Sequence, residues 1–142
     1  TVSVVLADEL IRLWQVTPPQ GATRMGDLEG AAALRFQHLF GAPPSEWVIR
    51  ADWDAARPFL ASAAPLNLLD GLQLAAETHR FHLVDIRPQF VAALNQWRQA
   101  RRAGAWFGQV HGGVLSLAAY DGAVLMAVRS SPIPAGAFAQ EG

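Results

Sequence analysis

The hydrophobic pattern of the first part of the chain predicts a strand, an ambiguous segment and a loop. Residues 2–7 form a β-branched apolar run, which is typical of a strand buried on both faces. Residues 8–16 continue with apolar side chains at a spacing that fits either a second strand or a short helix. The Pro and Gly content of residues 17–26 then indicates a loop.

Helical periodicity is clearest in two later segments. Residues 27–40 place apolar side chains on one face of a helix, and Gly41 supplies the stop. Residues 66–79 repeat this spacing with Pro65 near the first position, where proline is well tolerated. A third helix is expected to begin at Pro88 and to turn its apolar side chains toward the core.

Strands are predicted around these helices. Residues 47–53 alternate like a half-buried strand, and residues 57–63 are expected to pair with them through a turn at 54–56. Residues 81–86 indicate a further strand. Residues 104–129 predict a meander of three strands joined by glycine turns. This order predicts an α/β fold, with a mixed sheet flanked by helices.

The composition favours a large core or an apolar face for a partner. Of the 142 residues, 51% are hydrophobic and 16% are charged, and this length fits one domain over residues 1–142. The net charge of −1, without a basic run, gives no sign of a nucleic-acid partner. Cysteine is absent, which excludes disulfides and thiolate chemistry.

No apolar run reaches the roughly 18 residues that a membrane-spanning helix needs, and no signal peptide is visible. We therefore expect no direct membrane insertion by this chain. The sequence begins at Thr1 inside an expected strand, without an initiator methionine, and ends in a tail rich in small residues. We expect it to be a piece of a longer protein, whose other segments could hold an anchor.

Acidic residues give the first candidate chemistry, that of a metal-dependent nuclease. Such enzymes hold two metal ions with carboxylates on neighbouring strands, and Asp52, Asp85 and Asp121 lie in or beside expected strands. The first strand of the meander, residues 104–110, has no aspartate for such a site. A cap or an ion pair with nearby Arg87 explains Asp85 better, so a structural role is favoured.

The histidines and Ser62 predict packing or surface roles. The spacing of His79 and His82 spans a helix end and a strand start, whereas a metal-binding pair needs one rigid face. His38 and His111 have no ligand partner nearby in the sequence, so no metal site is expected. Ser62 lies in an apolar context without a nucleophile-elbow motif, which indicates a small packing residue.

The glycine turn of the meander is the one segment that offers a phosphate cradle. The chain has no Walker A loop and no dinucleotide-binding glycine motif. The candidate phosphate cradle is therefore the turn at Gly112 and Gly113. The favoured interpretation is a tight hairpin, because positive φ requires glycine there with or without a ligand.

A candidate protein-binding set follows from the five tryptophans of the chain. Most are expected in the core, but an exposed tryptophan makes a good interface anchor. Trp14, Pro18 and Pro19 lie in the least regular part of the sequence and form the candidate set. Plain core packing of Trp14 is the favoured alternative.

Taken in order, the segments resemble the cytoplasmic actin-like proteins of type IV pilus and type II secretion assembly, the PilM, MshI and GspL-like group. The similar passages are residues 1–14, 27–53, 58–97 and 104–129. In that group the second passage is a small inserted subdomain, and the last opens the second half of a ribonuclease H-like fold. The group's recurring polar and turn positions fall on Asp85, Pro88 and Asn95. The resemblance implies an actin-like unit that is partial or degenerate.

The departures from that group lie in its phosphate loop. Actin-like ATPases place an acid, a run of glycines and a hydroxyl there, which act on Mg²⁺ and phosphate. Matched to this chain, the acid position is Gln109, a glycine position is His111 and the hydroxyl position is Val114. Gly112 and Gly113 persist. The resemblance therefore implies that ATP hydrolysis is lost, and binding of nucleotide through backbone amides stays an option. The candidate nucleotide-binding residues that it implies are Gln109, His111, Gly112 and Gly113.

Three functional hypotheses result. The favoured one is a non-catalytic scaffold without a cofactor, in the cytoplasm at the inner membrane, which binds other proteins of a pilus or secretion machine. The first alternative is an actin-like switch or ATPase that binds ATP and Mg²⁺. The second is a metal-dependent nuclease. For the scaffold, we expect the partner to use a groove between subdomains or an exposed strand edge.

Overall fold

The structure, a computed structural model, describes residues 2–96, 105–111, 113–121 and 124–133. Three α-helices lie in these ranges: α1 (Met25–Phe40), α2 (Leu66–Thr78) and α3 (Gln89–Gln96). The strands are β1 (Val2–Leu6), β2 (Arg12–Val16), β3 (Trp47–Ala51), β4 (Phe59–Pro65), β5 (Leu83–Pro88), β6 (Ala105–His111), β7 (Val114–Asp121) and β8 (Val124–Pro132). Two 3-10 turns, η1 (Asp8–Leu10) and η2 (Pro44–Glu46), complete the described elements.

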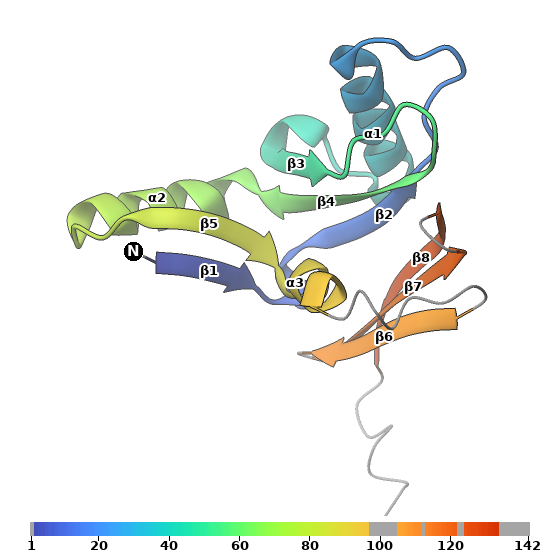
Figure 1. Cartoon of the computed structure of the whole chain (residues 1–142). Helices are drawn as coiled ribbons and strands as arrows, with labels where there is room; N and C mark the ends of the chain where they lie inside the picture. The colour runs from blue at the N-terminus through green and yellow to red at the C-terminus, as the bar shows by residue number, and fades with distance from the viewer. Residues whose placement is uncertain (1, 97–104, 112, 122–123, 134–142) are drawn as a thin grey trace, which may run out of the picture.

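The described strands form three small sheets, so the mixed α/β class is confirmed and the single mixed sheet is wrong for these residues (Figure 1). β1 and β5 form a parallel pair. β2, β4 and β3 form one antiparallel sheet, and β6, β7 and β8 form another. The 3-10 turn η1 separates β1 from β2 and leads the chain out of the first sheet into the second. The ambiguous segment 8–16 thus contains both a short helical turn and a strand.

Two hydrophobic clusters hold these sheets together. The first joins β1, α3 and the inner face of the meander, with Phe90 fully buried. The second lies between α1 and the β2–β4–β3 sheet, where Phe36 is fully buried and its ring centroid is 5.2 Å from that of Trp14. Gln15 connects β2 to the meander, because its Nε2 donates to the Leu125 carbonyl oxygen at 2.7 Å.

Several local predictions are confirmed. α1 ends at Gly41, which adopts φ 66° and donates its N–H to the Gln37 carbonyl oxygen. β3 and β4 pair across a turn in which the carboxylate of Asp54 accepts the backbone N–H groups of two turn residues, Ala56 and Arg57. α2 follows Pro65, and the meander has its three expected strands. The strand expected at 81–86 lies two residues later, at Leu83–Pro88.

The burial expected for residues 2–7 is wrong, although the strand itself is present. Ser3 and Val5 are exposed, and Val5 keeps 47% of its surface accessible. Half-buried Val4 and buried Leu6 face the first cluster, against which leucines of α2 also pack. β1 therefore has one covered face and one open face, because its parallel sheet has helices on a single side.

The segment 27–53, which resembles an inserted subdomain, shares its core with neighbouring elements. Its buried Leu28 and Phe36 pack in the same cluster as Val16 of β2 and Phe59 of β4. Its identity as an insertion stays a prediction. Within the described ranges, no helix combines the length and the apolar character needed to cross a membrane.

Candidate functional site

A groove of about 390 Å³ runs between β5 and the β3–β4 hairpin, and we call it the β5 groove. One side consists of the whole of β5, residues 83–88. The opposite side is formed by Val48 and Arg50 of β3 and by residues 62–64 of β4, and α2 contributes Leu69 and Gln73. Figure 1 shows β5 between β1 and the elements that form this opposite side.

The groove follows the backbone edge of β5. Successive side chains of a strand point to opposite faces of its sheet, so a groove over one face would touch every second residue. All six residues of β5 line the groove instead, and Leu6 of β1 and Ile11 also line it. β5 pairs with β1 on its other side, and no other described strand pairs with it. The groove therefore borders a strand edge whose backbone groups are free of ladder hydrogen bonds.

A parallel pair with two open edges is an incomplete arrangement. Parallel sheets normally have several strands and are covered on both faces, and an isolated pair of strands is only marginally stable. Here α2 packs on one face of the β1–β5 pair, while Val5 and Val84 on the two strands are 47% and 54% exposed. An added strand would bury apolar surface and satisfy the free edge of β5.

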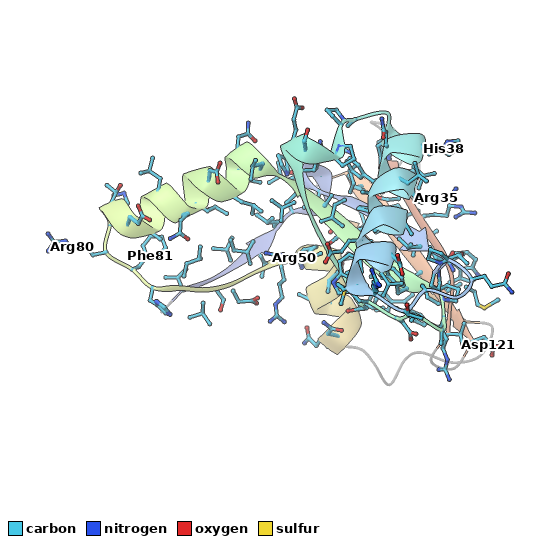
Figure 2. All side chains as sticks on the ribbon, turned by 90° about the horizontal axis from the view of Figure 1, so that it is seen from above. Arg35, His38, Arg50, Arg80, Phe81 and Asp121 are labelled. Atoms are coloured by element: carbon cyan, nitrogen blue, oxygen red, sulfur yellow. The ribbon has the colours of Figure 1, made fainter. Side chains whose placement is uncertain are left out.

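Of the two arginines that line the β5 groove, one forms an ion pair and the other does not. Arg87 Nε donates to Asp85 Oδ2, which confirms the ion pair expected for Asp85. Arg50, on the other side, has no ion-pair partner among the described residues. Figure 2 shows Arg50 near the middle of the molecule, between α1 and the α2–β5 part. An incoming chain thus meets a groove of mixed apolar and polar lining, in which Arg50 is an available cation.

The glycine turn has the geometry of a simple hairpin. His111 pairs with Val114, which leaves residues 112 and 113 as the connection. Gly113 has φ 76°, and its carbonyl oxygen accepts the N–H of Ile133 at 2.7 Å. Gly112 and the side chain of His111 lie outside the described part of the structure. Gln109 is half-buried, and its buried Oε1 has no hydrogen-bond partner among the described residues. Nucleotide binding at this turn stays a prediction.

The three residues of the candidate protein-binding set, Trp14, Pro18 and Pro19, differ in how deeply they are buried. Trp14 is 2% exposed and packs against rings of α1, so its proposed role as a surface anchor is wrong and the core-packing alternative is correct. The physical reason is that β2 lies in the second cluster, where the indole of Trp14 fills the space under α1. Pro18 is half-buried and Pro19 is exposed in the following loop, where Pro19 accepts a backbone hydrogen bond from Ala22.

The structure distributes the acidic and histidine candidates over different elements. Asp52 follows β3, Asp85 lies in β5 and Asp121 ends β7 at one extremity of the molecule (Figure 2). Among the described residues, no group of three or more metal-ligating side chains lies together. His38, His79 and His82 are exposed, and Ser62 is 8% exposed in the middle of β4, in agreement with a packing role.

The sequence did not reveal the buried carboxylate of Asp8. Asp8 is 3% exposed, and its Oδ1 accepts the N–H of Phe90 at the start of α3 at 3.0 Å. The hydroxyl of buried Ser116 lies 3.5 Å from Oδ2 and 3.4 Å from the hydroxyl of Ser130. In the sequence, the position of Asp8 directly after the apolar run 2–7 was the only indication that its carboxylate could be buried. Its contacts join η1, α3 and the meander.

Comparison with protein-family models gives no match, and comparison with curated proteins gives none either. Function is therefore inferred from the residues and their arrangement.

Proposed function

We propose that this chain is a non-catalytic scaffold domain of the actin-like kind, which binds other proteins of a pilus or type II secretion machine at the cytoplasmic side of the inner membrane. The observation that carries the proposal is the β5 groove, where a strand edge that no other described strand pairs with borders a groove of mixed apolar and polar lining. The sequence resemblance supplies the class of machine.

The groove supports binding of an extended polypeptide in particular. A strand that pairs with the edge of β5 would gain main-chain hydrogen bonds, and alternate side chains would enter the space between β5 and β3. Val84 of β5 and Val48 of β3 offer apolar contacts from the two sides. Arg50 would pair with a carboxylate on the incoming segment, since it has no described counter-ion. The partner is thus expected to present an extended, mainly apolar segment with an acidic residue.

Site-specific photo-crosslinking in the native host tests this proposal. A photoreactive amino acid at Val84 places the probe in the groove, and the same residue at Leu34, on α1, provides a matched control. Both positions are exposed apolar side chains, with 54% and 70% of their surface accessible, and Leu34 does not line the groove. We expect the Val84 probe, and not the Leu34 probe, to capture an inner-membrane protein of a pilus or secretion machine. Capture of unrelated proteins only, or equal capture at both positions, would refute the proposal.

Two charge-reversal variants, one inside and one outside the groove, measure how much the groove contributes to partner binding. Arg50→Glu replaces the free cation of the groove with an anion, whereas Arg57→Glu makes the same change in the exposed turn before β4, outside the groove. With the captured partner purified, Arg50→Glu should weaken binding by at least about tenfold, because a charged hydrogen bond contributes roughly 1.5–3 kcal/mol. Arg57→Glu should leave the affinity unchanged. Circular dichroism confirms that both variants fold.

A further inference from the structure

A second groove, of about 630 Å³, lies between α1, β2 and the end of β8, and it shares Ile11 with the β5 groove. We call it the arginine groove, because three arginines from three different elements line it: Arg12 of β2, Arg35 of α1 and Arg129 of β8. Ser130 and Ser131 add hydroxyl groups beside Arg129.

None of these three arginines forms an ion pair with any described residue. A guanidinium group stays protonated at all physiological pH values, so the groove carries three fixed positive charges. Asp8 and Glu9 also line the groove, so its three arginines face two carboxyl groups and positive charge is in excess. A further counter-charge would reduce the repulsion among the arginines. An anionic ligand would supply that counter-charge.

Two of the arginines are held in place by the protein. The Arg12 Nη1 donates to the Ile11 carbonyl oxygen at 3.0 Å, and its guanidinium carbon lies 5.4 Å from the centre of the Trp47 ring. The Arg129 Nη1 donates to the Val128 carbonyl oxygen at 2.8 Å. Each of these bonds uses one donor of the five that a guanidinium carries. The remaining donors are available to a ligand at little additional cost in side-chain entropy.

A buried donor without a partner provides an independent indication. Trp14 also lines the arginine groove, and it is 2% exposed. Its indole Nε1 is buried and has no hydrogen-bond acceptor among the residues that the structure describes. A buried N–H group left without an acceptor costs about 1–3 kcal/mol, so native proteins normally satisfy such groups with protein, water or ligand.

We propose that the arginine groove binds a small molecule through an oxyanion group, a phosphate or a carboxylate. The arginine donors and the hydroxyls of Ser130 and Ser131 match the acceptors of such a group. The acidic side chains in the lining lie at the η1 end: Glu9 is exposed, and buried Asp8 accepts hydrogen bonds from Phe90 and Ser116. The oxyanion is therefore expected to bind among the donors of Arg12, Arg35 and Arg129. This site is separate from the β5 groove and does not depend on the proposed protein partner.

Calorimetric titration of the full chain with pyrophosphate and, separately, with citrate tests the proposal. The matched pair of variants is Arg35→Gln and Arg80→Gln, since both side chains are exposed and both substitutions remove one positive charge. Figure 2 shows Arg35 on α1 and Arg80 at the far tip of the α2–β5 connection. We expect millimolar or tighter binding of at least one probe, weakened about tenfold or more by Arg35→Gln and unchanged by Arg80→Gln.

The two probes distinguish the sources of the oxyanion: stronger binding of pyrophosphate assigns a phosphate ligand, and stronger binding of citrate assigns a carboxylate. Glu9→Gln should leave the affinity for the probe equal or higher, because it removes from the groove a negative charge that repels the anionic ligand. The indole N–H signal of Trp14 in ¹H–¹⁵N spectra should shift on titration of the wild-type chain. Absence of binding of both probes at millimolar concentration would overturn the proposal. Equal weakening by Arg35→Gln and Arg80→Gln would do the same, since it would show a general effect of net charge.

Discussion

Replacement of Asp8 by alanine is expected to lower the free energy of unfolding by about 2 kcal/mol. The carboxylate is 3% exposed and accepts the N–H of Phe90 at 3.0 Å. A hydrogen bond to a charged group contributes roughly 1.5–3 kcal/mol, and the Phe90 N–H would remain buried without this acceptor. The loss is reduced because the variant no longer has to desolvate a carboxylate. Ser116 contributes less, since its hydroxyl is 3.5 Å away and also contacts Ser130.

Urea unfolding followed by tryptophan fluorescence measures this change. The midpoint should fall at a constant m value, and the melting temperature should fall by about 6 °C, at roughly 3 °C per kcal/mol for a chain of this size. Asp8→Asn retains an acceptor for Phe90 and should lose less stability than Asp8→Ala. Asp52→Ala is the matched control, because Asp52 is exposed and surface substitutions usually change stability by less than about 0.5 kcal/mol. If Asp8→Ala is no less stable than Asp52→Ala, the reasoning about the buried carboxylate is wrong.

Further predictions concern packing and backbone conformation, and the same urea assay tests the first two. Phe36→Ala should cost about 3–5 kcal/mol because Phe36 is fully buried, whereas Trp106→Ala should cost much less because Trp106 is 56% exposed; similar losses would contradict the assigned core. Gly41→Ala should destabilise by about 1 kcal/mol because Gly41 has φ 66°, and Gly30→Ala, inside α1 with open space around its Cα, should stabilise by up to about 1 kcal/mol; the opposite order would refute the boundary of α1. In hydrogen exchange, amides of β5 should exchange faster than those of β4, which has a partner strand on both sides; slower exchange in β5 would contradict an open edge.

The sequence predicted those elements whose signals are local. The helix over residues 27–40 was correct because its apolar spacing and Gly41 lie within one short stretch, and Gly41 does adopt the left-handed conformation. The β3–β4 pairing was predictable for the same reason, since Asp54 organises the turn between adjacent strands. In both cases, neighbouring residues determine the structure.

The sequence could not predict the distribution of strands over three sheets or the site that depends on it. The free edge of β5 follows from its pairing with β1, in which Leu83 lies opposite Val2, and no local pattern encodes that choice. Asp8 is 82 residues from Phe90 and 108 residues from Ser116 in sequence. The burial of Trp14 depended likewise on the packing of α1 over β2. Contacts between distant segments decided each of these features.

Asp8 and the β5 groove are physically linked, because α3 begins directly after β5 and its Phe90 N–H is held by Asp8. The same carboxylate contacts Ser116 of β7, so it ties the end of β5 to the meander. The second cluster, around Phe36, contains none of these residues. Loss of the Asp8 carboxylate should therefore loosen β5 and α3 more than α1. In Asp8→Ala, hydrogen exchange should accelerate in β5 and α3 while α1 changes little, and equal acceleration in all three would mean that Asp8 contributes only to global stability.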